Sequence, residues 1–245
     1  MNSGYYAACS GLRAQTQALE LIANNLANIN TPGYRGQLAT FRSILAAAQM
    51  AGANPLNRAI NDFSILGGTR LDLTSGNMTQ TGNPFDVAIE GDGFLVVQTK
   101  AGPMYTRNGN LQVSTTGQLV TPQGDPVLDD VNRPVLVPSG EASISTDGTL
   151  SVGGAVAGKL QVVDFAPDTR LAAEGTSYYS APQGTARPAA RAYVRQGMLE
   201  SSNVNPVLGM VSLISVQRHA DMMQRALSAY YNEFNRVAAG DLPRV

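Results

Sequence analysis

The sequence predicts an α+β fold in which paired N- and C-terminal helices form one discontinuous, coiled-coil-like helical domain beside a central antiparallel β-rich domain. Two observations lead to this prediction. At both ends of the chain, apolar residues recur at alternating spacings of three and four, as on the seam of paired helices. Between the ends, short runs with a period of two are separated by Gly, Asn and Asp, which is typical of antiparallel hairpins.

The first helix is expected from Ser3, a suitable N-cap, to about Asn28, because Thr31-Pro32-Gly33 cannot continue it. Few charges lie along this helix, so its polar side is expected to be packed as well. The predicted seam consists of Tyr5, Leu12, Leu19 and Leu26, with Ala8, Gln15, Ile22 and Ile29 between them.

The last helix is expected to begin at Asn205-Pro206, which offers a cap and a first-turn proline, and to run to about Ala238. Two helices with seams at opposite ends of one chain most economically pack on each other. Two unrelated helices that cap a central domain are the alternative. The predicted seam consists of Met210, Leu213, Gln217, Ala220, Gln224, Leu227, Tyr231, Phe234 and Ala238.

Residues 76–196 carry the β signal, with turn dipeptides such as Asn108-Gly109 and Asp147-Gly148 between apolar runs. The segment 34–50 remains open to a helical interpretation, and residues 51–69 are interpreted as a connector rich in Gly, Asn and Ala. The predicted strands lie at 86–89, 94–97, 104–106, 111–113, 119–121, 135–137, 142–145, 149–152 and 159–163.

Composition excludes several classes of function. Lys and Arg number 17 against 18 Asp and Glu, so no basic excess is present to bind nucleic acid. No apolar run is long enough for membrane insertion, and no basic and apolar N-terminal stretch predicts a cleaved signal peptide. Charged residues are only 14% of the chain. A polar but uncharged surface suits burial against neighbouring subunits, although a composition bias of the whole organism gives the same pattern.

No motif in the chain predicts catalysis, a cofactor or a metal site, so the protein is not expected to be an enzyme. His219 is the only histidine and lies within the last predicted helix, without a strand–turn–helix serine motif to partner it. Cys9 is the only cysteine and is interpreted as a small buried apolar residue. The stretch Glu90-Gly91-Asp92-Gly93 lacks the other ligands of a calcium or phosphate loop and is interpreted as a hairpin turn.

Three stretches together resemble one family. The sequence Asn24-Asn25-Leu26-Ala27-Asn28-Ile29-Asn30-Thr31-Pro32-Gly33-Tyr34-Arg35 closely resembles the N-terminal signature of the flagellar rod and hook family of bacterial axial proteins. Gly197-Met198-Leu199-Glu200-Ser201-Ser202-Asn203-Val204-Asn205-Pro206 resembles its C-terminal signature. The stretch 85–94, followed by Tyr105-Thr106-Arg107-Asn108-Gly109, is similar to the β domain of rod proteins. We refer to these stretches as the N-terminal, C-terminal and β motifs.

The resemblance implies a structural subunit of the flagellar basal-body rod in the periplasm, closer to the proximal than to the distal rod type. The expected partners are copies of the chain, other flagellar axial proteins and the flagellar type III export apparatus, through which the chain passes without a cleaved signal. The implied domains are a terminal-helix core (1–33 with 205–245), a connecting region (34–75 with 197–204) and an outer β domain (76–196). The competing class is a secreted β-rich adhesion module with helical oligomerisation ends, and a hydrolase is a third and poorly supported class.

Within this interpretation, the motif residues are expected to act in assembly. Amides crowd the end of the first helix, where they either terminate the helix or bond to a neighbouring subunit. Gly33 is expected to adopt a backbone geometry that other residues avoid, and Tyr34 to anchor the connector by its ring. The predicted assembly residues are Leu12, Leu19, Leu26, Asn24, Asn25, Asn28, Asn30, Gly33, Tyr34, Asn203, Asn205, Leu213, Leu227, Tyr231 and Phe234.

Overall fold

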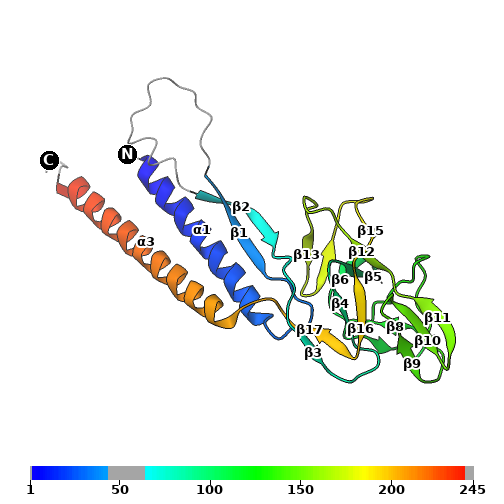
Figure 1. Cartoon of the computed structure of the whole chain (residues 1–245). Helices are drawn as coiled ribbons and strands as arrows, with labels where there is room; N and C mark the ends of the chain where they lie inside the picture. The colour runs from blue at the N-terminus through cyan, green and yellow to red at the C-terminus, as the bar shows by residue number, and fades with distance from the viewer. Residues whose placement is uncertain (1, 44–63, 241–245) are drawn as a thin grey trace. The chain divides into compact units, whose positions relative to one another are not determined.

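The computed structural model describes residues 2–43 and 64–240 and divides the chain into two compact units (Figure 1). Unit 1 contains the described residues of 1–26, 37–69 and 206–245, and unit 2 contains 27–36 and 70–205. The chain therefore passes between the units four times. The fold is α+β, with two helices and several antiparallel sheets among the described residues, as the sequence predicts.

The helices of unit 1 are α1 (Asn2–Ala27) and α3 (Pro206–Gly240). Helix α3 begins at the predicted proline, whose missing N–H would have no partner in the first turn of a helix. Helix α1 ends one residue before the predicted position, but it already includes Ser3, so this serine is not its N-cap. No helix in the described part of the chain is long and apolar enough to cross a bilayer.

Burial along α3 follows a three-four spacing but differs from the predicted seam at alternate positions. Leu213, Ala220 and Leu227 face inward as expected, whereas Met210, Gln217 and Gln224 are exposed. The inward positions that precede Leu213, Ala220 and Leu227 on the helix are Gly209, Val216 and Met223, respectively. The two choices lie one residue apart on the helix, and burying Val and Met is favourable where burying a glutamine amide is not.

In α1, the most buried line runs through Gly11, Ala14 and Ala18. The leucines of the predicted seam, Leu12, Leu19 and Leu26, lie beside this line and are half-buried. Near the start of α3, a Cβ atom added to Gly209 would lie 3.7 Å from Leu26 Cδ1, so the end of α1 and the start of α3 are in contact.

Strands β1 (Gln37–Ser43) and β2 (Ser64–Leu71) pair in a two-stranded sheet. The helical interpretation of residues 34–50 is therefore wrong over 37–43, and the remainder of that segment lies outside the described residues. Leu38, Thr40 and Phe41 are bulky or β-branched residues that favour a strand.

Unit 2 is built from antiparallel strands that form a six-stranded sheet of order β13-β14-β6-β5-β12-β15, a three-stranded sheet of order β11-β10-β9 and the pairs β16-β4, β17-β3 and β7-β8. The strands are β3 (Met78–Gln80), β4 (Val87–Glu90), β5 (Phe94–Thr99), β6 (Gly102–Thr106), β7 (Gln112–Val113), β8 (Leu119–Val120), β9 (Ala142–Ile144), β10 (Thr149–Val152), β11 (Ala155–Lys159), β12 (Val162–Asp164), β13 (Ala172–Glu174), β14 (Tyr178–Ser180), β15 (Arg187–Pro188), β16 (Tyr193–Gln196) and β17 (Met198–Glu200).

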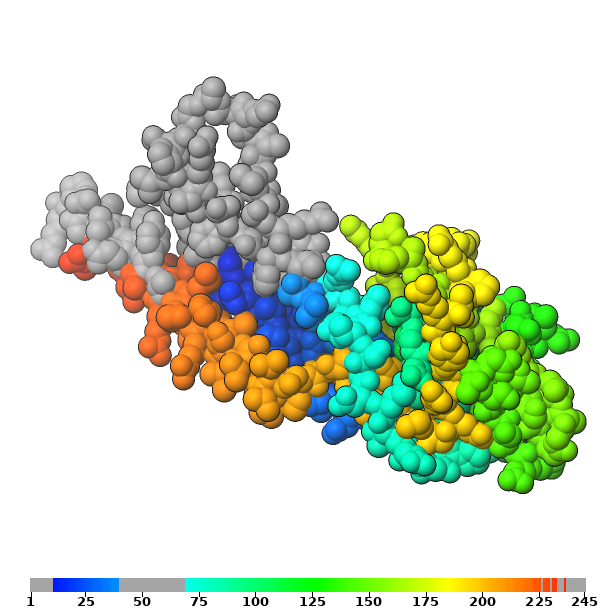
Figure 2. Space-filling view, in the orientation of Figure 1, coloured from blue at the N-terminus to red at the C-terminus, as the bar shows by residue number. Residues whose placement is uncertain are grey.

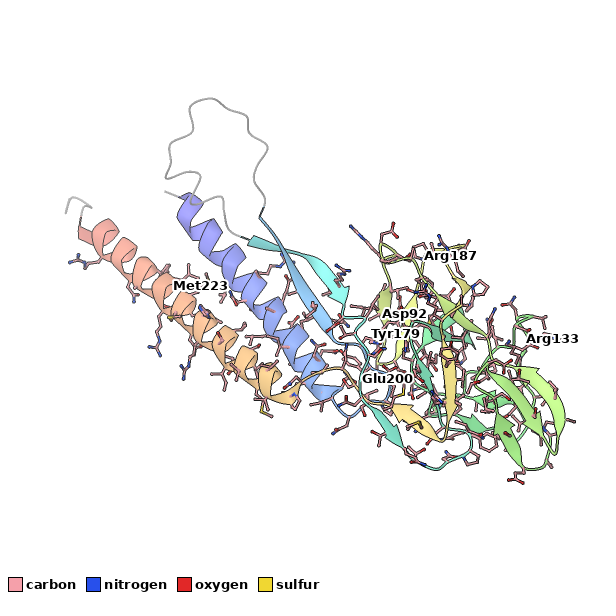
Figure 3. All side chains as sticks on the ribbon, viewed as in Figure 1. Asp92, Arg133, Tyr179, Arg187, Glu200 and Met223 are labelled. Carbon is pink, nitrogen blue, oxygen red and sulfur yellow. The ribbon has the colours of Figure 1, made fainter. Side chains whose placement is uncertain are left out.

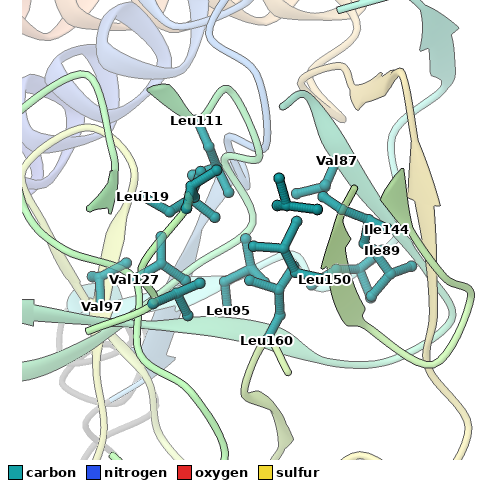
Figure 4. Packing of buried hydrophobic residues seen from close by; sticks show 14 residues of the cluster. Val87, Ile89, Leu95, Val97, Leu111, Leu119, Val127, Ile144, Leu150 and Leu160 are labelled. Carbon is teal, nitrogen blue, oxygen red and sulfur yellow. The ribbon is translucent and has the colours of Figure 1, made fainter. Parts of the chain in front are cut away.

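The six-stranded sheet is covered by a core on each face. On β5, Leu95 and Val97 belong to the larger core, whereas Phe94 and Val96 belong to the smaller one. A strand buried on both faces has no polar side, which explains the continuous apolar run in the sequence. Figure 4 shows the larger core, which combines aliphatic side chains from strands and connecting loops.

Three predictions in this region are wrong. Residues 159–163 do not form one strand, because Lys159 ends β11 and Val162 begins β12, and these strands belong to different sheets. Residues 135–137 form no strand but only an isolated bridge at Leu136, because Pro134 and Pro138 on either side lack the N–H groups that a longer ladder needs. Residues 90–93 form no hairpin turn. They connect β4 to β5, and these strands belong to different sheets.

Candidate functional site: a buried arginine–glutamate cluster

The three family-like motifs meet within unit 2 at one buried ionic group. It consists of Arg35 from the N-terminal motif, Arg107 from the β motif and Glu200 from the C-terminal motif, which we call the arginine–glutamate cluster. The exposed fractions of the three residues are 1%, 3% and 0%. Charged side chains are rarely buried to this degree unless they are paired.

Glu200, on β17, is the centre of the cluster. Its Oε1 atom lies 2.8 Å from Arg35 Nη2 and accepts a hydrogen bond of 2.9 Å from the Gly76 backbone N–H. Its Oε2 atom accepts a bond of 3.3 Å from Arg107 Nη1. The Glu200 carbonyl also accepts the Gly33 N–H at 2.7 Å, which attaches the N-terminal motif to the same strand. Figure 3 labels Glu200 near Tyr179 and Asp92.

Other nitrogens of the two guanidinium groups bind backbone carbonyls, whereas the buried Arg35 Nε and Arg107 Nε have no hydrogen-bond partner among the described residues. Arg35 Nη1 donates to Thr74 O at 2.7 Å. Arg107 donates to Ile89 O at 3.1 Å and to Gly91 O at 2.7 Å, and its guanidinium carbon lies 5.3 Å from the centre of the Phe94 ring. The stretch Glu90-Gly91-Asp92-Gly93 and the preceding Ile89 therefore bind an internal arginine, through the carbonyls of Ile89 and Gly91.

Two cations and one carboxylate place a net positive charge inside unit 2. Burial lowers the pKa of Arg107, and the neighbouring Arg35 guanidinium lowers it further, whereas Glu200 raises it. The exposed Asp92 also favours the charged form of Arg107. A guanidinium stays protonated even when its pKa is lowered, so Arg107 remains a cation. Both guanidinium groups are paired with Glu200.

Tyr179 joins the cluster to the smaller core. Its hydroxyl accepts the Arg35 backbone N–H at 2.9 Å, and its ring packs edge-on against Phe94 with ring centres 5.6 Å apart. Burial of the side chain raises the pKa of Tyr179 to about 12. The folded chain therefore keeps this phenol neutral at pH values where the unfolded chain ionises it.

This shift predicts alkaline destabilisation. Stability that depends on the neutral Tyr179 is fully present below about pH 10 and is lost as the pH rises to about 12, by up to about 2.7 kcal/mol for a shift of two pKa units. Tyr179→Phe should lose about 1 kcal/mol at neutral pH, because the Arg35 N–H loses its partner, but should show a weaker decline in alkali. Urea unfolding of both chains between about pH 9 and pH 11.5 tests this.

The matched control for this prediction is Tyr193→Phe, because the Tyr193 side chain is 57% exposed. The free energy of unfolding of Tyr193→Phe should decrease with rising pH as steeply as that of the unsubstituted chain. An equally steep decline of Tyr179→Phe would show that the buried phenol does not cause the loss of stability.

Gly33 packs directly on the β motif. Its φ angle is +68°, the unusual geometry expected from the sequence, and a Cβ atom there would lie 2.2 Å from the Arg107 carbonyl carbon. Gly109 is equally close to β4, since an added Cβ would lie 1.6 Å from Val87 O. Glycine is thus required at both positions by close contact of two backbones.

The predicted amide residues have separate local roles. Asn25 exchanges two hydrogen bonds with the Gln37 backbone, at 2.8 and 2.9 Å, and fastens the start of β1 to α1 within unit 1. Asn28 is buried, and its Oδ1 accepts the Thr31 hydroxyl at 3.2 Å, consistent with helix termination. The Asn203 side chain binds two backbone segments, as described below. Asn24, Asn30 and Asn205 are exposed.

The other predicted residues are distributed over both units. Tyr34 is buried in unit 2, and burial raises its pKa. Leu213 and Leu227 are half-buried on α3, whereas Tyr231 is 61% exposed in the single chain. The side chains of Phe234 and Cys9 lie outside the described residues. His219 is exposed, and its Nδ1 atom lies 2.7 Å from Ser215 O on the same helix.

Sequence reasoning did not select Arg35, Arg107 or Glu200 as site residues, although each lies in a quoted motif. The available signal was the scarcity of charge: in a chain with 14% charged residues, each motif nevertheless carries a charged residue beside apolar or small ones. Among the described residues, no three His, Cys, Asp or Glu side chains come together as metal ligands.

Comparisons with known proteins match the same three regions. Residues 6–35 match a family model described as "Flagella basal body rod protein", residues 88–152 the "Flagellar hook protein FlgE/F/G D1 domain", and residues 195–232 the "Flagellar basal body rod FlgEFG protein C-terminal". The three matched regions contain Arg35, Arg107 and Glu200, respectively, which are the three members of the arginine–glutamate cluster. The third region also contains Asn203.

Curated relatives match over most of their length. The flagellar basal-body rod protein FlgF of Escherichia coli is 36% identical over 94% of this chain and 94% of its own. The FlgF of Caulobacter vibrioides is 34% identical over 89% of each chain. The rod protein FlgG of Agrobacterium fabrum is 32% identical over 90% of this chain and 92% of its own. With its motifs joined in one buried cluster and its relatives matched almost from end to end, the chain belongs to the family of flagellar basal-body rod proteins.

Proposed function

We propose that the chain is a structural subunit of the flagellar basal-body rod, of the proximal FlgF type, which polymerises into the helical shaft that transmits torque and encloses the export channel. The observation that carries this proposal is the match to FlgF relatives over about nine-tenths of both chains, at 33–36% identity. FlgG relatives match at 30–32%, so the distal type is the second candidate.

The helical unit supplies the polymerising core in this proposal. Helices α1 and α3 pair antiparallel, supported by the contact between Leu26 and Gly209 and by the inward row on α3. Small residues on the buried line of α1 allow the partner helix a close approach. The inner tube of the rod is then formed by residues 1–33 with 205–245.

A second apolar face of α3 is available to neighbouring subunits. In the single chain, the first part of α3 exposes large apolar side chains. This part of the helix is coloured orange in Figure 2. An apolar surface of this kind marks an interaction site, and repetition of one heterologous contact generates a helical filament. The exposed residues on this face and along the helix are Val207, Leu208, Met210, Val211, Ile214, Met222 and Tyr231.

The β-rich part, residues 76–196, forms the outer layer in this proposal, and 34–75 with 197–204 connect it to the helices. The partners are copies of the chain and other axial rod proteins. Delivery is by the flagellar type III export apparatus as a largely unfolded chain. The role is mechanical, and it requires no cofactor.

Complementation tests the proposed function. A strain of the source bacterium that lacks this gene should not swim, and the unsubstituted chain should restore swimming and be found in purified basal bodies by mass spectrometry. Electron cryo-microscopy of those basal bodies should place the chain in the proximal segment of the rod. Its presence only in the distal segment would support the FlgG type, and swimming of the deletion strain would contradict both candidates.

Adjacent residues on α3 test which face packs inward. Met223→Asp places a charge on the half-buried row and should lower the stability of unit 1 by about 2–3 kcal/mol, whereas Gln224→Asp on the exposed neighbour should change it by less than about 0.5 kcal/mol. Leu227→Asp, and Leu26→Asp on α1, should behave like Met223→Asp. Helical circular dichroism during thermal unfolding of the full chain is the measurement.

The same variants extend the test to assembly. Met223→Asp, Leu227→Asp and Leu26→Asp should prevent incorporation into basal bodies while the β signal of the purified chain is retained. Equal effects of Met223→Asp and Gln224→Asp would contradict the inward row given above.

A further inference from the structure

Three of the four chain passages between the units are bonded to one another inside unit 2. They lie next to Gly36, to Arg70 and to Asn205. The Asn203 side chain connects them: its Oδ1 accepts the Gly36 N–H at 2.7 Å, and its Nδ2 donates to Asp72 O and to Thr74 O, each at 2.9 Å. We call these four residues, all in unit 2, the Asn203 cluster.

Backbone bonds close the Asn203 cluster. The Asp72 N–H donates to Gly36 O at 2.7 Å, and the Asn203 N–H donates to Tyr34 O at 3.4 Å. An amide has an acceptor and a two-proton donor on one short side chain, so Asn203 can bind the N–H of one segment and the carbonyls of another simultaneously. A carboxylate has no donor for the carbonyls, and an aliphatic side chain binds neither.

The partners of Asn203 belong to the connecting segments rather than to the sheets. Gly36, Asp72 and Thr74 belong to neither of the two hydrophobic cores. Loss of the Asn203 amide should therefore release the connecting segments from one another and leave the cores folded.

We propose that Asn203 is a positioning residue that makes three connecting segments leave the β unit as one bonded group, so that load carried by α3 and by the β1–β2 pair enters the β unit at one place. This inference rests on the proposed rod function. A segment that is not bonded to its neighbours can move separately under load, whereas segments joined through one amide move together. The same residue is thus expected to matter more for force transmission than for folding.

Hydrogen exchange of the full chain provides the structural test. In Asn203→Ala, exchange should become about tenfold faster at the Gly36 N–H, which loses its acceptor, and also at the Asp72 N–H, which Asn203 does not touch. In Asn203→Asp, the acceptor for Gly36 remains, so Asp72 should be affected more than Gly36. Leu95 and Val163 in the two cores should exchange at unchanged rates. Gln112→Ala, an exposed amide on β7, is the control.

Swimming of the deletion strain that carries each variant provides the mechanical test. The Asn203→Ala subunit should be found in basal bodies, but its cells should lose swimming speed in viscous medium relative to Gln112→Ala cells. Unchanged exchange at Asp72, equal acceleration in the cores, or undiminished swimming under load would each overturn the proposal. Failure of the unsubstituted chain to reach basal bodies would instead contradict the rod function itself.

Discussion

Glu200→Gln is expected to destabilise unit 2 by about 3–5 kcal/mol, because it removes the one carboxylate that forms ion pairs with both buried arginines in the described part of the chain. The substitution preserves the shape of the side chain, so the loss comes from charge and hydrogen bonding rather than from a cavity. Arg35 Nη2 and Arg107 Nη1 would each face a neutral amide, in an interior where Glu200 and both arginines are almost fully buried. A domain of ordinary stability loses much of its free energy of unfolding by such a change.

The control for this prediction is Glu90→Gln. Glu90 forms an ion pair with Arg195 at 2.7 Å, closer than the contact between Glu200 and Arg107, but both partners are about half exposed. An exposed pair contributes about 0–1 kcal/mol, because water solvates both ions when the pair is broken. Urea unfolding of the full chain, followed by the β signal in circular dichroism, compares the two variants. Equal losses for Glu200→Gln and Glu90→Gln would contradict a structural role of the buried cluster.

The effect should extend to assembly. Glu200 holds the N-terminal motif through Gly33 and Arg35, and it lies in the C-terminal motif that leads into α3. In cells that carry Glu200→Gln, we therefore expect the subunit to be unfolded and motility to be lost. Asn203→Ala is expected to keep the folded subunit, so the two substitutions separate folding of the β unit from force transmission through its connecting segments.

Local signals in the sequence were sufficient for the elements whose ends are set by nearby residues. Asn205-Pro206 marked the start of α3, because a cap and a first-turn proline act within one helical turn. The run from Phe94 to Val97 marked β5, because its apolar residues are needed on both faces of the sheet. In both cases the sequence pattern and the tertiary packing favour the same structure.

The remainder depended on contacts between distant segments. Arg107 and Glu200 are 93 residues apart, and nothing near either one in sequence indicates its partner. Met223 and Gln224 are adjacent on α3, and either one could complete an inward row with Leu213, Ala220 and Leu227. The spacing of those three residues alone does not determine which of the two is buried. Strands of two residues such as β15 are formed by pairing with a longer strand and have no periodicity of their own.

Gly33→Ala is expected to lower the stability of unit 2 by more than about 3 kcal/mol, because two unfavourable effects coincide at this position. The φ angle of +68° lies in the left-handed region, which costs an alanine about 1–2 kcal/mol. An added Cβ would also lie 2.2 Å from the Arg107 carbonyl carbon and 2.4 Å from its oxygen. These are backbone atoms, so relief requires the N-terminal motif to move away from the β motif.

Gly82 separates the two effects. Its φ angle is +77°, but a Cβ atom there would meet nothing within 4 Å. Gly82→Ala should therefore lose only the conformational part, about 1–2 kcal/mol. Asparagine tolerates left-handed geometry, so Gly82→Asn should lose less free energy of unfolding than Gly82→Ala. Gly33→Asn should still lose much of it, because its Cβ meets the same Arg107 carbonyl.

Urea unfolding of the four variants measures these differences, and hydrogen exchange at the Gly33 N–H, which donates to Glu200 O at 2.7 Å, reports whether the motif has separated. If Gly33→Ala and Gly82→Ala lost the same free energy, close packing of the N-terminal motif on Arg107 would be excluded as the reason for glycine at this position. A larger loss for Gly33 together with faster exchange of its N–H would establish that the flagellar signature sequence at the end of α1 stabilises the β unit, in addition to any contact that it makes in the assembled rod.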